Sequence, residues 1–444
     1  MGAEDWIACT VGDVAAPGRN ALVGGPFGSD LVSRDYVPCG VPVIRGTNMG
    51  RGRWLDGEFA FVSPEKADSL SANLARPGDI LFTQRGTLGQ VALVPDKGFD
   101  RYLISQSQMK LTVDPAKACA HFLYYVFTSA EQQAYIRQNA IQTGVPHTNL
   151  GILRGTPIVL PSLRSQKSIA HLLGTLDDKI ELNRRMNETL EAMARALFKS
   201  WFVDFDPVRA NAQRRQPTGM DAETAKLFPS EFVKSELGEI PKGWRSVPLS
   251  EAAELNPLRR IEKGAPAPYV EMSSLPTTGH RPSAWPLRQA GSGARFQNGD
   301  TLLARITPCL ENGKTGYVDF LDNGVVAWGS TEYMVVRPRA PLPPEWGYLL
   351  ARDNVFREFA AQKMEGTTGR QRVSADSLGR YVVALPCSAV GERFGQLVAV
   401  FFRKTGANHD ENATLAGLRD ALLPRLLSGE LSVKTAAQAV EAIA

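Results

Sequence analysis

Sequence phrases from the first half of the chain recur in the second half. Three short phrases reappear in the same order: Gly78-Asp79-Ile80-Leu81 as Gly299-Asp300-Thr301-Leu302, Leu160-Pro161-Ser162 as Leu385-Pro386-Cys387, and the pair Asn183 and Asn187 as Asn408 and Asn412. Their separations stay near 221 to 225 residues, roughly constant, as in a duplicated structural unit. Each half holds a compact segment of roughly 150 residues and then one long helix-like stretch. We therefore expect two similar domains, each followed by a spacer, that present two similar surfaces.

Size and composition narrow the class of protein. A chain of 444 residues can hold two or three domains with cores of their own. The densest apolar run, Leu397 to Phe402, is far shorter than the roughly 18 residues that a membrane helix needs, so no membrane partner is expected. The five cysteines are scattered, odd in number and without a CxxC pair, which favours a reducing cytoplasm and argues against disulfides or a zinc site. The net charge of +4 permits nucleic-acid binding without requiring it.

Two stretches are predicted to form long helices. Between residues 166 and 201 proline is absent and apolar side chains recur in steps of three and four, as in the seam of a coiled coil. Ser165 is the expected N-cap, and the helix must end before Pro207. Residues 391–427 repeat the pattern, with Pro424 expected to kink the last turns. The predicted seam positions are Leu173, Leu176, Ile180, Asn183, Asn187, Leu190 and Leu197 in the first helix, and Phe394, Val398, Phe401, Asn408, Asn412, Leu415 and Leu422 in the second.

Two such seams would expose too much apolar surface if they stood apart, so we expect them to bury each other as an antiparallel pair. The asparagines then meet near the middle, where a buried polar residue costs stability but fixes the register. The alternative is a wetter, looser middle of the pair.

The segments between the helices are rich in glycine and proline and contain short strand-like runs, as at residues 41–44, 79–82 and 90–94. Residues 121–138 are predicted to form one helix. The expected fold class is α+β, with two similar globular domains, two long antiparallel helices forming a coiled coil, and a pseudo-two-fold internal repeat. The expected boundaries are 1–162 for the first domain, 163–204 for its helix, 205–240 for a polar linker, 241–388 for the second domain, 389–430 for its helix and 431–444 for a tail without an assigned role.

Several phrases, in this order and spacing, resemble the specificity subunit of a type I restriction–modification system over nearly the whole chain. The opening phrase is Gly25-Pro26-Phe27-Gly28-Ser29, and the middle of the first domain contributes Pro77-Gly78-Asp79-Ile80-Leu81 with Arg85-Gly86. The centre contributes residues 201–208, which read WFVDFDPV, and residues 237–244, which read LGEIPKGW. Residues 422–431, which read LLPRLLSGEL, close the second helix.

This resemblance implies a protein that binds DNA without doing chemistry on it. In the family, each of two target-recognition domains reads half of a split double-stranded target, and the helices fix the gap and dock two methyltransferase subunits. A restriction subunit is a further expected partner. No cofactor is expected in this chain: S-adenosylmethionine belongs to the methyltransferase partner, and ATP and Mg²⁺ to the restriction partner.

Each catalytic motif that the sequence matches in part lacks residues that the motif requires. Gly313-Lys314-Thr315 resembles the end of a phosphate-binding loop, but Pro308 stands where the first glycine is needed. Asn256-Pro257-Leu258 lacks the second proline and the aromatic residue of an amino-methyltransferase loop. No HExxH is present, and the five histidines are isolated in sequence. We therefore expect neither a catalytic nor a metal site.

Residues that could contact DNA lie in loops punctuated by glycine, where cations reach phosphates and Arg, Asn and Gln reach base edges. In the first domain the candidates are Arg45, Asn48, Arg51, Arg53, Arg85, Gln142, His147 and Thr148, and in the second they are Arg305, Lys314, Arg370 and Arg372. The loops at 142–149 and 367–374 are counterparts of similar polarity, which strengthens both. The alternative for each is an ordinary solvated loop. Arg259, Arg260 and Lys263 are interpreted as a solvated charge run.

Two aromatic features have competing explanations. The loop around Phe27 is interpreted as a structural turn packed by that side chain, with a DNA-contacting loop as the alternative. Trp201 and Phe202 are predicted to pack in a core or against a partner rather than to stack on bases.

Two other classes of function remain open: a self-contained DNA methyltransferase or nuclease, and a coiled-coil connector that joins proteins. Product formed by the purified chain alone would favour the first. Loss of DNA binding on charge reversal of Arg370 and Arg372, with the partner complex intact, would argue against the second.

Overall fold

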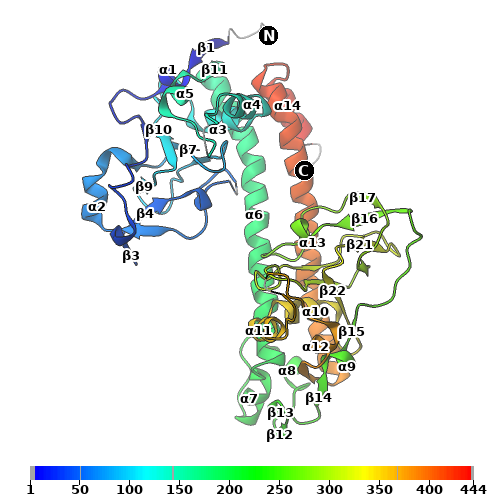
Figure 1. Ribbon diagram of the computed structural model, residues 1–444. Coiled ribbons are helices and arrows are strands. Elements are labelled where there is room, and N and C mark those ends of the chain that lie inside the picture. The colour runs from blue at the N-terminus through cyan, green and yellow to red at the C-terminus, as the bar shows by residue number, and fades with distance from the viewer. Residues whose placement is uncertain (1–5, 51, 143–144, 368, 442–444) are drawn as a thin grey trace. The chain divides into compact units, whose positions relative to one another are not determined.

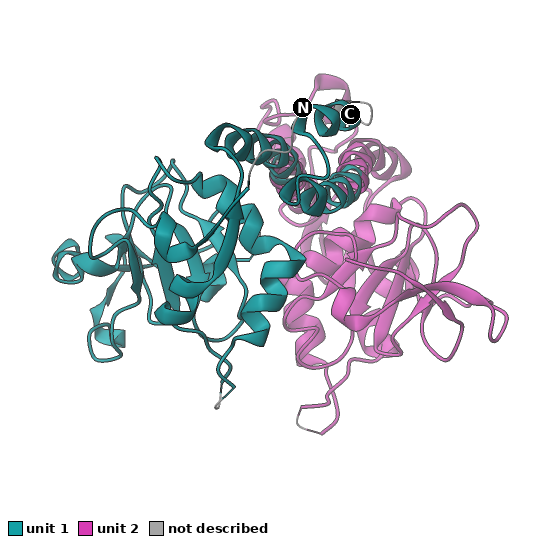
Figure 2. Ribbon diagram, turned by 90° about the horizontal axis from the view of Figure 1, so that it is seen from above, with its two compact units in different colours: residues 1–182, 411–444 teal, residues 183–410 magenta. Residues whose placement is uncertain are grey.

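The computed structural model describes residues 6–50, 52–142, 145–367 and 369–441. It divides into two compact units: unit 1 contains Met1–Leu182 and Glu411–Ala444, and unit 2 contains Asn183–Asp410. Figure 2 colours the two units separately. The division passes through both long helices, α6 (Leu163–Phe202) and α13 (Ser388–Leu427). Each unit therefore combines one globular domain with part of the helix pair.

The two units contain the same central sheet, in which all neighbouring strands are antiparallel. In unit 1 the strand order is β2 (Leu22–Gly24), β10 (Gln108–Leu111), β7 (Ile80–Thr83) and β8 (Val91–Leu93). In unit 2 it is β15 (Ala253–Leu255), β22 (Tyr333–Pro338), β19 (Thr301–Ala304) and β20 (Thr315–Tyr317). The identical order is the structural form of the sequence repeat.

A second sheet in each unit contains one parallel pair, β4 with β9 in unit 1 and β16 with β21 in unit 2. The unit 1 order is β3 (Tyr36–Val37), β5 (Ala60–Val62), β4 (Val41–Ile44), β9 (Tyr102–Ile104) and β6 (Leu74–Ala75). The unit 2 order is β17 (Leu287–Gln289), β16 (Pro266–Val270), β21 (Ala327–Gly329) and β18 (Arg295–Phe296). The remaining antiparallel ribbons are β1 (Ile7–Thr10) with β11 (Pro157–Leu160), β14 (Arg245–Pro248) with β23 (Val382–Leu385), and β12 (Phe232–Ser235) with β13 (Gly238–Pro241).

Shorter helices complete each unit (Figure 1). Unit 1 has α1 (Val11–Val14), α2 (Pro64–Ser69), α3 (Ala120–Thr128), α4 (Ala130–Gln138), α5 (Leu150–Gly155) and α14 (Val433–Glu441). Unit 2 has α7 (Asp206–Ala212), α8 (Ala222–Ala225), α9 (Leu249–Ala252), α10 (Pro344–Arg352), α11 (Asn354–Gln362) and α12 (Ala375–Gly379). Single 3₁₀ turns are η1 (Ser33–Asp35), η2 (Gly46–Asn48), η3 (Ser71–Asn73) and η4 (Met272–Ser274).

The repeated Gly-Asp phrase closes the turn before the central strand of each unit. Gly78 and Gly299 have φ of +85° and +88°, a region that favours glycine. The aspartates behind them are buried: Asp79 accepts hydrogen bonds from the backbone of Arg76 and the hydroxyl of Thr112. Asp300 is fully buried between two guanidinium groups, Arg259 at 2.6 Å and Arg337 at 2.7 Å. Arg259 is therefore an internal ion-pair partner, and its interpretation as part of a solvated charge run is wrong.

Inside unit 1, the first part of α6 packs antiparallel to the last part of α13. The amide of Asn412 donates to the carbonyl of Ile180 at 3.3 Å, and Arg419 donates to Asp177 at 2.8 Å. Leu173, Leu176, Leu422 and Leu426 are buried in one core together with the central sheet and α3, where Phe127 meets Phe82 with ring centroids 4.8 Å apart.

Inside unit 2, the last part of α6 packs against the first part of α13. Asn408 is fully buried and donates to the side-chain oxygen of Asn187 at 2.7 Å. Trp201 and Phe202 are buried against Phe394, with the Phe202 and Phe394 centroids 4.7 Å apart. The mixed fold with its antiparallel coiled coil is confirmed, and every predicted seam residue is buried or half-buried. A buried, hydrogen-bonded asparagine pair does not fit the alternative of a wet, loose middle.

Two segments predicted to be plain connectors are packed elements. The stretch after α6 forms α7, α8 and the β12–β13 ribbon, and it places Phe205, Val208, Phe228 and Ile240 in the core of unit 2. The tail forms α14, whose Ala436 is buried in the core of unit 1. The apolar residues of the first segment are too widely spaced to form a recognisable period. Those of α14, Val433, Ala436 and Val440, do recur in steps of three and four, and the expectation of a plain tail missed this signal.

Two local expectations differ from the structure, and a third, a helix that contains Pro424 and ends at Leu427, agrees with it. Residues 121–138 form two helices, α3 and α4, because the hydroxyl of Ser129 caps a new helix at the backbone of Gln132. Helix α6 begins at Leu163, and the hydroxyl of Ser162 accepts from the backbone of Ser165, so Ser165 is not the cap. Helix α13 continues through Pro424 to Leu427. Over the described residues, no helix combines the length and apolarity that crossing a membrane requires.

Asp300→Asn should destabilise unit 2 by about 3 to 5 kcal/mol, because it leaves two guanidinium groups without their buried counter-charge. Urea unfolding of the full chain, followed by tryptophan fluorescence, measures this loss. Asp322→Asn, at an exposed position, is the matched control. Equal stability of the two variants would contradict the role given to Asp300.

Unit 2 should lose stability as pH falls from about 6.5 towards 4, because burial, together with His280 and Arg281, lowers the pKa of His409 to about 4. In the unfolded chain, histidine has its ordinary pKa of about 6.5 and is protonated in this pH range. In the folded chain His409 stays neutral there, so protonation favours unfolding. Asp319 and Asp410 also face His409 and partly oppose the shift. Thermal unfolding at pH 7.5 and 5 should differ less in His409→Gln than in the wild type or in His171→Gln, at an exposed position.

Candidate nucleic-acid interface

One end of the central sheet gathers the candidate residues in each unit. In unit 1, β2 and β7 end there and β10 begins there, since Gly24 pairs with Met109 and Thr83 pairs with Gln108. In unit 2 the corresponding strand ends are Leu255, Ala304 and Tyr333. The loops that follow or precede these strands form what we call the loop cluster of each unit: residues 25–31, 84–87, 105–107, 141–142 and 145–148 in unit 1, and residues 256–259, 305–307, 330–332, 365–367 and 369–373 in unit 2.

A small hairpin completes the loop cluster of unit 1. Ile141 and His147 exchange two backbone hydrogen bonds, of 2.8 and 3.2 Å. His147 also forms a backbone bridge with Arg85, and the backbone of Thr148 donates to the carbonyl of Gln84 at 3.0 Å. The hairpin is thus tied to the loop that follows β7. The structure brings Arg85, Gln142 and His147 into one place, although they are far apart in sequence; residues 143–144 of the hairpin lie outside the described part.

Unit 2 repeats this arrangement bond for bond. Glu365 and Arg372 exchange two backbone hydrogen bonds of 2.9 Å each, Arg372 bridges Ile306, and the backbone of Val373 donates to the carbonyl of Arg305 at 3.0 Å. The correspondence between the loops at 142–149 and 367–374 is therefore structural. The bonds match Arg305 with Gln84 rather than with Arg85.

Of the predicted cations around residue 50, Arg45 is exposed and Arg51 lies outside the described residues. Asn48 and Arg53 are placed differently from the prediction. Asn48 is 2% exposed, and its side chain accepts from the backbone of Arg45 and donates to the carbonyls of Asp56 and Glu58, so it holds the loop together.

Arg53 is buried and is not available to DNA. Its guanidinium bonds Asp178 of α6 at 2.5 Å and the hydroxyl of Tyr125 at 3.4 Å. That hydroxyl donates to Asp177 at 2.6 Å, and burial raises the pKa of Tyr125 far above its usual range. Arg53 thus ties its loop to the helix of unit 1. The sequence around it shows only a glycine-punctuated basic loop, which looks the same whether an arginine points outward or inward.

In unit 2, Glu332 holds two of the predicted arginines. Arg372 approaches its carboxylate with Nε at 2.9 Å and Nη2 at 2.7 Å, and the Nε of Arg305 lies 3.5 Å away. The hydrogen bond from Arg372 holds the pKa of Glu332 below its ordinary value, so the carboxylate stays charged. Glu332 was not predicted, because its contact with Arg372 depends on the hairpin. In unit 1, Ser107 occupies the place of Glu332, as the carbonyls of both residues accept from the matched loop.

Of the two remaining candidates in unit 2, one cation is exposed and the other is held by a hydrogen bond. Arg370 is exposed near the tip of the hairpin, close to residue 368, which lies outside the described residues. Lys314 is half-buried and donates to the carbonyl of Met272 at 2.7 Å. Its ammonium group supports η4 instead of standing free in a turn.

The loop that contains Phe27 is a turn, but Phe27 does not pack it. The side chain is 83% exposed. The backbone of the loop is held instead by Gln106, whose amide donates to the carbonyls of Gly28 and Leu31. The interpretation of Phe27 as an internal packing residue is therefore wrong.

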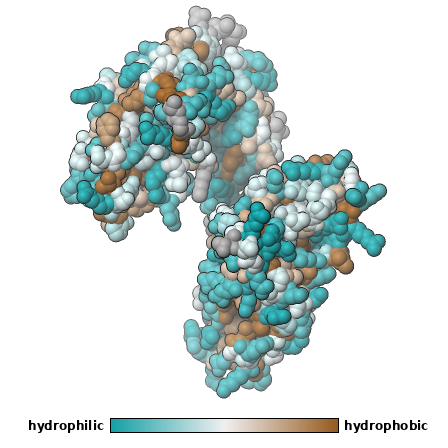
Figure 3. All heavy atoms as spheres, viewed as in Figure 1, coloured by the Kyte–Doolittle hydropathy of each residue, from teal (hydrophilic) through white to brown (hydrophobic). Residues whose placement is uncertain are grey.

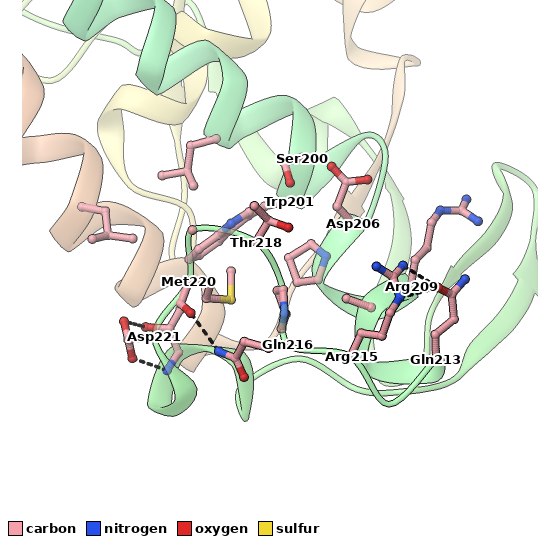
Figure 4. A pocket seen from close by; sticks show the side chains of 17 residues that line it. Ser200, Trp201, Asp206, Arg209, Gln213, Arg215, Gln216, Thr218, Met220 and Asp221 are labelled. Atoms are coloured by element: carbon pink, nitrogen blue, oxygen red, sulfur yellow. Dashed lines mark hydrogen bonds between the residues drawn. The ribbon is translucent and has the colours of Figure 1, made fainter.

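A pocket of about 450 Å³ lies in unit 2 beside the end of α6 (Figure 4). Several of its polar side chains are already engaged: Arg215 donates to Gln213, Gln216 donates to the carbonyl of Met220, and Asp221 caps α8 through Thr224. Among the residues that line it, nothing forms a nucleophile with an adjacent base, so the pocket suggests no reaction.

Comparisons with known proteins agree with these features. Residues 35–192 match the family model described as the type I restriction modification DNA specificity domain. The chain is 26% identical to the type I restriction enzyme HindI specificity subunit of Haemophilus influenzae, over 96% of this chain and all of that one. It is 23% identical to the MjaIX specificity subunit of Methanocaldococcus jannaschii, over 97% of this chain and 94% of that one.

The fold has a solved counterpart. The crystal structure of a type I restriction–modification S subunit from M. genitalium superposes with a TM-score of 0.57 at 14% identity, covering 96% of this chain and 97% of that one. Its overall likeness and the near-complete sequence matches extend over both halves of the repeat. The chain is therefore similar, over nearly its whole length, to specificity subunits of type I restriction enzymes.

Proposed function

We propose that this chain recognises double-stranded DNA at a bipartite site, with one half-site read by the loop cluster of each unit. The observation that carries the proposal is the repeated hairpin, which is tied by the same backbone hydrogen bonds in both units. The hairpins and their neighbouring loops present Arg85, Gln142 and His147 in unit 1, and Arg370 and Arg372 in unit 2. These side chains suit phosphate and base-edge contacts.

The chain would supply recognition and leave the chemistry to its partners. We infer that it docks two methyltransferase subunits, which carry S-adenosylmethionine, and that a restriction subunit using ATP and Mg²⁺ can join them in the cytoplasm. The names of the relatives, as specificity subunits of restriction enzymes, support this assembly. The purified chain should neither methylate nor cleave DNA when methyl donor or Mg²⁺ is added, and product formed without partners would overturn this division of labour.

Selection of duplexes from a random library by the purified chain tests the proposal directly. Two short conserved elements separated by a fixed unconserved spacer are the expected outcome. Affinity for the selected duplex should fall steeply with salt, because lysine and arginine displace counterions from phosphates. A single uninterrupted motif, or binding that ignores both sequence and salt, would contradict a bipartite reading.

Arg370→Glu should weaken binding to the selected duplex by roughly tenfold or more, because a cation at the hairpin tip becomes an anion facing phosphate. Arg85→Glu should act through the other half-site. Fluorescence anisotropy on duplexes with one half-site scrambled measures this: each variant should lose its effect on only one of the two scrambled duplexes. Lys404→Glu, on the exposed side of α13, is the control. Unchanged binding by both hairpin variants would remove the hairpins from the interface.

Glu332→Gln should strengthen binding to unrelated duplex and reduce the preference for the selected one. The change releases Arg372 and Arg305 from a carboxylate that fixes their direction and offsets their charge. The slope of log affinity against log salt should steepen by about one, as expected for one more phosphate contact. Glu358→Gln, an exposed carboxylate on α11, removes the same charge elsewhere. If both variants behave alike, only net charge matters and Glu332 does not orient the arginines.

A further inference from the structure

The two most exposed large apolar side chains in the described part of the chain occupy matching loops. Leu258 is 100% exposed and Phe27 is 83% exposed, followed by Leu287 at 70%. Each is the third residue past the end of the corresponding edge strand, β2 in unit 1 and β15 in unit 2, and each directly follows a proline. Single exposed apolar residues are ordinary on protein surfaces. Two at corresponding places in the two repeated domains call for a shared cause.

The loop that carries Phe27 is held in place. The backbone of Gly25 donates to the carbonyl of Gln108 at 2.8 Å, and the backbone of Asp30 donates to the carbonyl of Phe27 at 2.9 Å. A Cβ at Gly25 would lie 2.0 Å from the carbonyl oxygen of Ser105, so only glycine permits this approach to the loop before β10. The loop is thus fixed, and it directs a phenyl ring into solvent.

Leu258 is held in the same way by different residues. The backbone of Asn256 donates to the carbonyl of Val335 at 2.7 Å, and its side-chain oxygen accepts from the backbone of Val335 at 3.0 Å. On the other side, Arg259 is anchored to buried Asp300. Leu258 therefore lies between two fixed residues and has no apolar contact to lose by moving. A fixed loop avoids an ordering cost when it binds.

The surroundings of Leu258 are polar and basic, and those of Phe27 are polar. Leu258 lines an open hollow of about 340 Å³ together with Arg295 and Arg305. In unit 1, the side-chain oxygen of Gln84 lies 3.5 Å from where a Cβ would stand on Gly24, so the Phe27 loop leaves β2 beside the loop of Arg85. In the view of Figure 3 the surface of each unit is largely hydrophilic, with apolar residues in small scattered patches. An isolated apolar side chain among cations and amides suits a DNA groove better than an apolar protein surface.

We propose that Phe27 and Leu258 are the apolar base contacts of the two half-sites, each lying against bases while neighbouring arginines hold the phosphates. This inference rests on the proposed function and adds specific residues to it. Phe and Leu offer a base no hydrogen bond, but they pack against thymine methyl groups or against the face of an unstacked base. The proline before each side chain fixes one backbone angle of the loop, which limits the directions from which the side chain can approach a base. The two side chains differ in shape, so they fit different base steps.

Phe27→Ala and Leu258→Ala in the full chain, measured on the selected duplex, test the proposal. Each variant should weaken DNA binding roughly tenfold, because the free energy gained by burying one large apolar side chain against the DNA is lost. Scrambling one half-site should abolish the effect of Phe27→Ala, and scrambling the other should abolish that of Leu258→Ala. A scan with single abasic sites should then find, for each variant, one or two positions where base removal and side-chain removal are not additive.

Ile7→Ala and Val355→Ala are matched controls, because they remove exposed apolar side chains from β1 and α11, outside the loop clusters. Circular dichroism and melting temperature show whether each variant is folded, and the exposed positions make folding defects easy to separate from binding defects. Binding losses equal to those of the controls would overturn the proposal. So would losses that are additive with every abasic position.

Failure of this inference is distinguishable from failure of the proposed function. If the wild-type chain selects no bipartite duplex, the function itself fails. If it does, and Arg370→Glu weakens binding while Phe27→Ala and Leu258→Ala do not, only the base contacts fail. Weaker capture of the methyltransferase partner by the alanine variants, with DNA affinity unchanged, would also overturn the proposal and assign the two side chains to a protein contact.

Discussion

Burial of the apolar seam between α6 and α13 is the constraint on which the rest of each unit depends. Neither helix could remain exposed in water with leucines and phenylalanines along one side, so each unit pairs a piece of one helix with a piece of the other. The same helices then supply Asp177 and Asp178 in unit 1 as anchors for Tyr125 and Arg53. Seam packing thereby fixes the frame from which the loops of each domain extend.

The helices and the repeat could be predicted because they leave periodic signals: seam positions in steps of three and four, and Gly-Asp turns whose buried carboxylate leaves little choice of residue. The packed linker could not, since its apolar residues are widely spaced, and the helical period of α14 spans only nine residues. Arg53 and Phe27 were assigned to the wrong surroundings for a related reason. A short polar loop does not encode which side chain turns inward, and only the position of Asp178 or Gln106 decides it.

In the candidate site, too, the backbone arrangement could be predicted from the sequence, whereas the surroundings of the side chains could not. The matching offsets located both hairpins, because their backbone bonds to the loops after β7 and β19 are identical. Their side chains differ: Glu332 fixes two arginines in unit 2, whereas Ser107 and Gln84 stand in the corresponding positions of unit 1. One backbone frame thus carries two electrostatically distinct surfaces, as two unlike half-sites would require.

The composition of unit 1 also bears on how the protein is made. Its core joins residues near the start of the chain, such as Val11, to Leu422, Leu426 and Ala436 near the end. Unit 2 is continuous in sequence, whereas unit 1 takes its residues from both sides of it. The domain that is synthesised first is therefore completed last. Until Leu422, Leu426 and Ala436 arrive, unit 1 exposes the apolar surface that they cover in the folded chain.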